Sequence, residues 1–219
     1  MNVDFNGLAS KERYKLLSSF VVPRPIALVT SLGEAGVVNA APYSFFNCFG
    51  SDPGLVILNV GDRPEDDHGG VAKDTARNAE RHGFFVVNAV DAGMAERMNG
   101  CAASFPPGES EAEAVGFTLA ACPGTDVPRI AEAPASFACR THRVEAIGGN
   151  RLVLGEVLHG SFREGLVDPE SWRVDPDAFT PLGRLGGAGG YTRCGDRLEM
   201  KRPSVEEARR LGSGGAPTA

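Results

Sequence analysis

The feature that most constrains this chain is a series of short apolar runs, each bounded by glycine, proline or asparagine. Residues 26–31, 55–60 and 84–90 are rich in valine, isoleucine, leucine or phenylalanine, and each run is too short for a core helix. Runs of this kind predict buried β-strands. The chain also holds 28 glycines and 15 prolines with no period. Such a composition favours a turn-rich β fold over a helical bundle.

Turn residues indicate how these strands are connected. Residues 32–36 form a glycine-flanked turn, so the strand at 26–31 and the extended path from Val37 onward predict a hairpin. Two longer strands are expected at 136–147 and 152–162, joined by a tight turn at 148–150. We expect a last strand at 191–200.

Helices are expected only between and around the strands. One is predicted at 10–18, with Ser10 as its cap, and one at 74–82, ending at Gly83. Residues 91–115 predict a helical excursion broken by the prolines at 106–107. We expect one domain over 1–203, and residues 204–219 as a short helix followed by a flexible tail.

Charge and cysteine usage exclude several classes of function. The net charge of -6 argues against a nucleic-acid surface. No signal peptide is recognisable, and no apolar stretch reaches the roughly 18 residues of a membrane span, so we expect a cytoplasmic protein. The five cysteines are odd in number and form no CxxC pair, which favours reduced thiols over disulfides or zinc.

The clearest candidate site is the start of the predicted helix at 74–82. A helix start carries unpaired N–H groups and a partial positive charge, and Lys73 adds a full charge there. Thr75 and Asn78 add hydrogen-bond donors at the same end. The pattern is therefore suited to a phosphate. The alternative is a helix capped by Asp74 or Thr75 beside a solvated lysine.

The predicted hairpin offers two further polar features. Thr30 and Ser31 end a buried strand just before Gly33, where their hydroxyls bind a ligand or simply begin a turn. The segment 39–46 is expected to be irregular, because Pro42 bars it from the middle of a regular ladder. Its unpaired backbone groups would suit a flat heterocycle. The alternative is an edge strand with a bulge and a buried aromatic pair.

A fourth feature is the glycine-rich segment 181–187, followed by Tyr191. Glycines on both sides of Arg184 allow the backbone to approach a ligand closely, and an arginine suits a phosphate. The alternative is a plain surface loop. The segment is no dinucleotide-binding fingerprint, since a GxGxxG motif after a strand is absent.

Taken together, these segments resemble the flavin reductase-like family with the FMN-binding split barrel. The resemblance extends from Val21 to Pro203. The segments in this order are more specific for the family than any one segment alone. The segments are 24–31, 39–47, 52–56, 73–78, 83–88 and 183–187 with Tyr191. It implies a mainly β fold with flanking helices, namely an antiparallel, Greek-key-like split β-barrel. It also implies a homodimer with FMN near the subunit interface.

The resemblance further implies which residues bind FMN. The pair at 30–31 would meet the phosphate-ribityl part, the segment 39–44 would line the isoalloxazine ring, and the helix start would hold the phosphate. Arg24 and Arg184 match family positions near the flavin. The implied cofactor-binding residues are Arg24, Thr30, Ser31, Asn39, Ala40, Ala41, Pro42, Tyr43, Ser44, Lys73, Thr75, Asn78 and Arg184. Residues 91–135 match no motif of the family, so the substrate stays open.

The expected activity is an NAD(P)H-dependent flavin reductase, in which NADH or NADPH passes hydride to the flavin N5 and a partner monooxygenase uses the reduced flavin. The flavin supplies this chemistry, so we expect no catalytic acid, base or nucleophile from the chain. Two alternatives stay open. The flavoprotein acts directly on an organic acceptor as a reductase or oxygenase, or it is an FMN-binding electron carrier without nicotinamide activity.

Overall fold

The computed structural model describes residues 1–63, 71–106 and 108–213. The flexible tail expected after the last helix, and the second proline of the expected break at 106–107, lie outside these residues. None of the described helices is long and apolar enough to cross a membrane.

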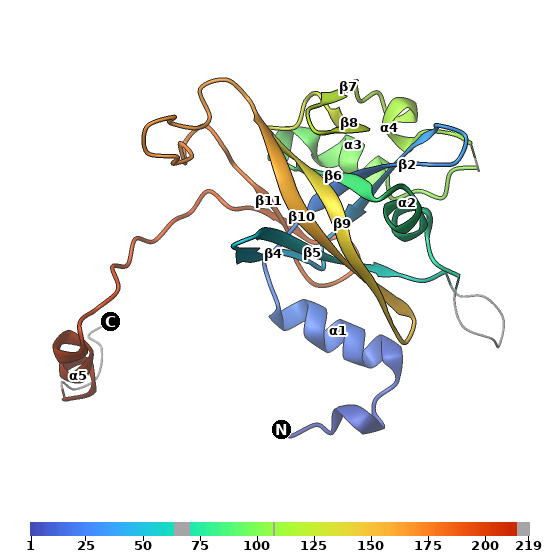
Figure 1. Ribbon diagram of the computed structural model, residues 1–219. Coiled ribbons are helices and arrows are strands. Elements are labelled where there is room, and N and C mark those ends of the chain that lie inside the picture. The colour runs from blue at the N-terminus through green and yellow to red at the C-terminus, as the bar shows by residue number, and fades with distance from the viewer. Residues whose placement is uncertain (64–70, 107, 214–219) are drawn as a thin grey trace.

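The architecture is centred on a seven-stranded antiparallel sheet with the order β3-β2-β6-β9-β10-β5-β4 (Figure 1). Three hairpins build most of it, since β2 pairs with β3, β4 with β5 and β9 with β10. The strands are β2 (Ala27–Leu32), β3 (Val38–Tyr43), β4 (Phe46–Ser51), β5 (Gly54–Gly61), β6 (Phe84–Ala89), β9 (Ala135–Ile147) and β10 (Asn150–Phe162). The hairpins predicted around 32–36 and 148–150 are thereby confirmed.

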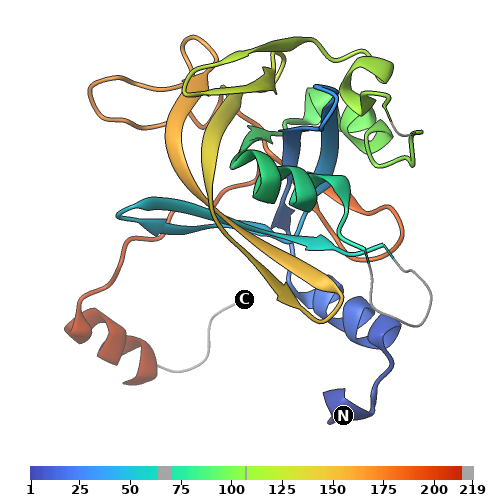
Figure 2. The same ribbon diagram turned by 45° about the vertical axis from the view of Figure 1, so that its right-hand side comes forward.

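The sheet curls, and the chain itself shows why. β3 and β4 are its two opposite edges, yet only Ser44 and Phe45 connect them. Three Cα–Cα steps span at most roughly 11 Å, so the two edges must approach each other at that corner. The long strands β9 and β10 connect the two halves of the sheet, because β9 pairs with β6 and β10 pairs with β5 (Figure 2). The result is the mainly β, antiparallel barrel that the family resemblance implies.

Two small sheets flank the barrel. β7 (Leu119–Cys122) and β8 (Thr125–Ile130) form a ribbon, and β11 (Leu182–Arg184) pairs with β1 (Arg24–Pro25) and β12 (Tyr191–Arg193). The prediction of a long last strand at 191–200 was wrong. Its partner β11 is only three residues long, so the chain has no ladder to continue beyond Arg193.

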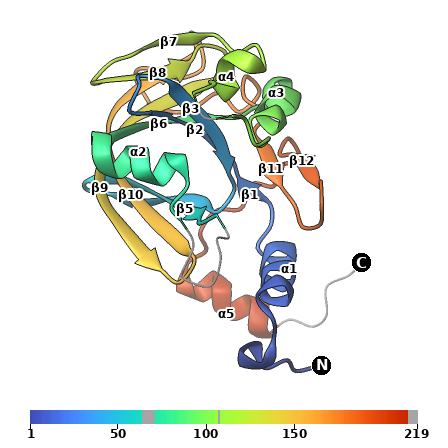
Figure 3. The same cartoon turned by 90° about the vertical axis from the view of Figure 1, so that its right-hand side faces the viewer.

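The helices lie around the sheet. They are η1 (Phe5–Gly7), α1 (Ser10–Phe20), α2 (Asp74–His82), η2 (Ala92–Met94), α3 (Ala95–Gly100), α4 (Glu111–Ala114) and α5 (Val205–Ser213). α2 lies on one side of the β2–β3 hairpin, and α3 and α4 lie on the other (Figure 3). α5 stands away from the barrel in Figure 1.

Two helix ends test the predictions directly. Gly83 ends α2 in the left-handed conformation with φ of 80°, as expected. Ser10, however, is the first residue of α1 and does not cap it. Ala9 takes the cap position, and its N–H donates to Glu12 Oε2 at 2.7 Å. A glutamate three residues later therefore satisfies the helix start that Ser10 was expected to cap.

β2 lies at the centre of the core because both of its faces are buried. Ala27 and Val29 pack in a cluster with Ala79 of α2. Leu28, on the opposite face, packs with Met98 of α3. A strand covered on both faces reads as a continuous apolar run, which explains its strong signal in the sequence.

Candidate functional site

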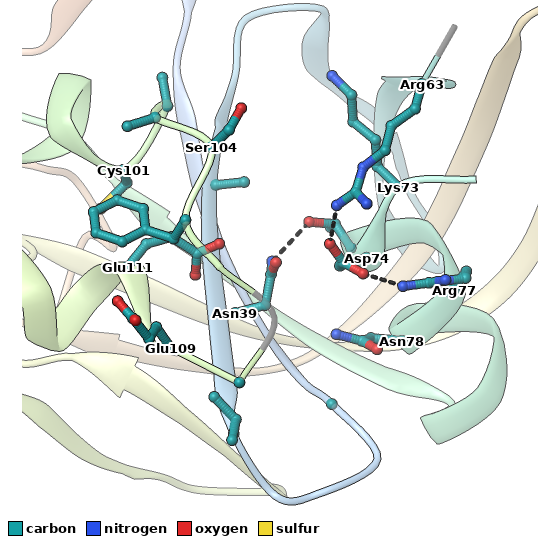
Figure 4. A pocket seen from close by; sticks show the side chains of 18 of the residues that line it. Asn39, Arg63, Lys73, Asp74, Arg77, Asn78, Cys101, Ser104, Glu109 and Glu111 are labelled. Carbon is teal, nitrogen blue, oxygen red and sulfur yellow. Dashed lines mark hydrogen bonds and ion pairs between the residues drawn. The ribbon is translucent and has the colours of Figure 1, made fainter. Parts of the chain in front are cut away.

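A cavity of about 1130 Å³ lies between α2, the β2–β3 hairpin and residues 101–106 and 108–111 (Figure 4). Side chains of α2 form one wall and β3 contributes a second. The described residues after α3 and the start of α4 form the opposite wall, which carries Glu109 and Glu111. Elements that are distant in sequence thus meet around one open space.

Thr75 joins α2 to β3 at this cavity. Its hydroxyl oxygen accepts a hydrogen bond from Asn39 Nδ2 at 3.0 Å and another from the Tyr43 hydroxyl at 2.8 Å. The oxygen thereby uses both acceptor positions, which leaves its own proton to donate elsewhere. Burial raises the pKa of Tyr43 to about 12. Tyr43 is therefore a neutral hydroxyl at physiological pH.

Ser31 and Asn78 extend the same network into β2. Asn78 Nδ2 donates to Ser31 Oγ at 3.1 Å, and both side chains are buried. Asn39 Nδ2 lies 3.5 Å from the same serine oxygen. Five of the predicted site residues thus meet in one polar network between β2, β3 and α2.

The start of α2 gathers positive charge. Lys73 occupies the N-cap position without a side-chain cap, and its side chain is exposed at the cavity wall. Asp74, the first helical residue, pairs with both Arg63 and Arg77. No sequence motif singled out these two arginines. Arg77 carried a signal, since it lies one helical turn after Lys73, whereas Arg63 reaches the cavity only through the fold.

The opposite wall was also missed, because residues 91–135 carry no recognisable motif. Glu111 Oε2 accepts a hydrogen bond from the Ala40 N–H at 2.8 Å and so anchors α4 to the edge strand β3. Burial raises the pKa of Glu111, although the Ala40 N–H opposes the shift. Burial, and after it the Glu111 carboxylate, raises the pKa of the neighbouring Cys101 to about 12.

The predicted segment around Pro42 reaches the cavity in a form that differs from the prediction. Residues 38–43 form a regular strand in which Pro42 lies opposite Leu28, so the expected irregular segment was wrong. β3 is an edge strand, and an edge tolerates a proline because no second partner needs its N–H. Ala41 and Pro42 line the cavity. The Ala40 side chain points away from that of Ala41 and is buried in the cluster that holds Met98.

Thr30 is not brought to this cavity. Neighbouring residues of a strand point to opposite faces, so Thr30 points away from Ser31. Its hydroxyl donates to the Pro128 carbonyl of β8 at 2.6 Å and accepts from Asn88 Nδ2 at 3.3 Å. Thr30 thus connects β2 to β8 and β6.

Arg24, Ser44 and Arg184 lie together elsewhere, near the β1–β11 ladder, in which Arg24 is opposite Arg184. Arg24 is 4% exposed and donates to the carbonyls of Ser18, Val21 and Leu185, and to Ser44 Oγ at 3.4 Å. Arg184 donates to the Gly190 carbonyl at 2.8 Å. Both arginines are occupied by groups of the chain itself, and neither lines the cavity.

Comparisons with known proteins agree with this architecture. A model of the flavin reductase like domain matches residues 18–180. The structure of Pseudomonas fluorescens 2-nitrobenzoate 2-nitroreductase NbaA is similar at 43% identity and a TM-score of 0.83, over 94% of this chain and 98% of that chain. Nitrilotriacetate monooxygenase component B from Bacillus cereus is similar at 32% identity and a TM-score of 0.84, over 91% and 98%.

A third structure concerns the fold alone. A putative flavin reductase with a split barrel domain from Shewanella frigidimarina has 20% identity and a TM-score of 0.77, over 93% of this chain and 100% of that chain. The domain match covers most of the chain, and the two closer structures span nearly all of it. The chain therefore belongs to the flavin reductase-like family of split-barrel flavoprotein oxidoreductases.

Proposed function

We propose that this chain binds FMN in the cavity beside α2 and reduces it with NADH or NADPH. The observation that carries the proposal is the cavity itself, which joins the cation-lined start of α2 to the polar network of β3. A flavin mononucleotide has both matching parts, an anionic phosphate and a flat ring with a polar edge. Residues 1–203 would then act as one flavin-binding domain.

The described residues fit such a ligand. The α2 helix starts without a side-chain cap, and its N-terminal amides with Lys73 provide an anion site. Ligand pockets commonly enclose roughly 300–1,000 Å³. At about 1130 Å³ the cavity has room for more than one bound molecule. That room suits a nicotinamide beside a flavin.

Each part of the chain has a defined task in this proposal. Bound FMN would supply hydride acceptance at its N5. Lys73 and the α2 amides hold the phosphate end, while Thr75 has its hydroxyl proton available for the ligand. Tyr43 stays uncharged and holds Thr75, so it fixes the wall without adding a negative charge. The chain positions the ligands and provides no acid or base for the hydride step.

A second candidate is direct reduction of an organic acceptor such as a nitroaromatic acid. It is favoured by the 43% identity to an enzyme named as a 2-nitrobenzoate nitroreductase. The component B of a monooxygenase, at 32% identity, instead favours delivery of reduced flavin to a partner oxygenase. A carrier that binds FMN without nicotinamide activity is the third possibility. We also propose a homodimer, as the family resemblance implies.

Steady-state oxidation of NADH and NADPH, with and without added FMN, separates these functions. Turnover that depends on added FMN supports the flavin reductase. Turnover of the FMN-loaded protein that requires 2-nitrobenzoate supports the direct reductase, and failure with both nucleotides supports the carrier. An equilibrium titration that detects no flavin binding would refute all three.

A further inference from the structure

We propose that Asp74 is a positioning residue that holds the guanidinium groups of Arg63 and Arg77 beside Lys73, so that three cations face one phosphate. This inference rests on the proposed function, because it assumes that a phosphate lies at the start of α2. It adds two phosphate-binding arginines that the sequence did not single out.

The geometry of Asp74 is specific. Its Oδ2 accepts from Arg63 and its Oδ1 accepts from Arg77, so each carboxylate oxygen holds a different arginine. Figure 4 shows Asp74 between the two arginines, and Lys73 directly precedes Asp74 in the chain. Arg63 follows β5 and Arg77 lies on α2, so the carboxylate joins two elements at the cavity wall.

Exposure argues against a mainly structural role for these pairs. The side chains of Arg63 and Arg77 are 53% and 54% exposed, and Asp74 is 35% exposed. Ion pairs this accessible to solvent contribute little to folding. Both guanidinium groups nevertheless pair with the first residue of α2, and both arginines line the cavity.

The charges match a phosphate monoester. The three cations and the Asp74 carboxylate have a net charge of +2 together. A phosphate monoester carries about −1.5 to −2 at pH 7. Two guanidinium groups and an ammonium group repel one another when they converge without an anion. The carboxylate offsets this repulsion before the ligand arrives, and such preorganisation reduces the cost of binding.

The inference is testable because an Asp74 without a positioning role should have the opposite effect on FMN affinity. A carboxylate near a phosphate repels it, so a carboxylate without a positioning role would weaken binding, and its removal would tighten binding. Asp74→Asn removes the charge and keeps the shape. If Asp74 positions the arginines, Asp74→Asn should lower FMN affinity by about threefold to tenfold, and riboflavin affinity should not change. Unchanged or tighter FMN binding would overturn the proposal.

Arg77→Gln tests whether Asp74 acts through its partner. Loss of a charge-assisted hydrogen bond of about 1.5–3 kcal/mol corresponds to roughly a tenfold to hundredfold loss of FMN affinity. The double variant Asp74→Asn/Arg77→Gln should lose less than the product of the two single losses, since both remove the same Arg77 contact. Multiplicative losses would count against the proposal.

Arg140→Gln is the matched control for net charge. Arg140 lies on β9, pairs with Glu156 and is 56% exposed. Both flavins should bind this variant as they bind the wild type. Equilibrium flavin titrations supply the readout, and circular dichroism checks each fold. Asp74→Ser, which retains a residue favoured at helix starts, replaces Asp74→Asn should the latter not fold.

The binding data separate the proposed function from the positioning role of Asp74. A wild-type protein that binds neither flavin, or that binds FMN no better than riboflavin, contradicts the proposed function. A wild-type preference for FMN that Asp74→Asn leaves intact contradicts only the positioning role.

Discussion

Thr75→Val is the sharpest test of how the cavity wall is built. Thr75 is 2% exposed, and its hydroxyl oxygen accepts from both Asn39 and Tyr43. Valine has nearly the same shape as threonine, so the substitution removes the hydroxyl without leaving a large void. The two donors of β3 then lose their shared acceptor, while the apolar packing of α2 stays in place.

The structure sets the expected size of the effect. A buried donor left without an acceptor costs about 1–3 kcal/mol. Asn39 and Tyr43 are only partly buried, and Asn39 keeps a weak contact with Ser31 at 3.5 Å, so each loss falls in the lower half of that range. Two losses of about 1–2 kcal/mol each should lower the unfolding free energy by about 2–4 kcal/mol. For a chain of this size this lowers Tm by roughly 4–16 °C.

Urea unfolding of the flavin-free protein measures this change, and Thr141→Val is its matched control. Thr141 donates one hydrogen bond, at 2.7 Å, to the Ala79 carbonyl, which also accepts from the Gly83 N–H. Without the Thr141 hydroxyl, the Ala79 carbonyl still accepts from the Gly83 N–H. The unfolding free energy should therefore fall by only about 1 kcal/mol or less. If Thr75→Val costs no more than Thr141→Val, the Thr75 hydroxyl does not hold β3 to α2 and the reasoning is refuted.

Three further predictions follow from the site and its buried groups. Lys73→Ala should lower FMN affinity roughly tenfold to hundredfold but spare riboflavin, because a charge-assisted bond to phosphate is worth about 1.5–3 kcal/mol; equal losses for both would mean that Lys73 is only solvated. Burial raises the pKa of Cys101 and Cys139 to about 12, so alkylation near neutral pH should modify exposed Cys48 and leave both unmodified, as mass spectrometry can show. Burial also raises the pKa of Tyr43 to about 12. The neutral form is favoured in the fold, so its stabilisation is full below the ordinary value of about 10 and is lost as pH rises toward 12; an equally steep alkaline loss in Tyr43→Phe would contradict this.

Local signals account for the parts of the fold that the sequence predicted. β2 and β6 begin with apolar runs, at 27–29 and 84–87, because both strands are buried inside the sheet. The end of α2 at Gly83 needed only a glycine and a preceding basic turn. By contrast, β4 was not predicted, since most of its residues are exposed and no apolar alternation marks it. β8 contains Pro128, which weakened the strand signal there.

The site was predictable on the α2 side and unpredictable on the other. Lys73, Thr75 and Asn78 lie within six residues, so helical periodicity alone brings them to one end of α2. Glu111 meets Ala40 across 71 positions of sequence, and that contact exists only after β3 and α4 are placed on the barrel. Contacts between residues so distant in sequence produce no local motif, so this wall of the cavity could not be predicted.

The order of the family segments along the chain predicts the fold, but residues that are adjacent within a segment need not lie together in the structure. Thr30 and Ser31 stand side by side in sequence, but the strand turns one toward β8 and the other toward Asn78. Arg24 donates to backbone carbonyls of the α1 end and of the loop after β11, which hold that corner together. A loss of flavin binding in Arg24 or Thr30 variants could therefore result from a distorted barrel as well as from a lost contact with the flavin. A residue that binds the phosphate is distinguished from one that maintains the cavity wall by a single pattern. Its substitution lowers FMN affinity but changes neither riboflavin affinity nor the free energy of unfolding.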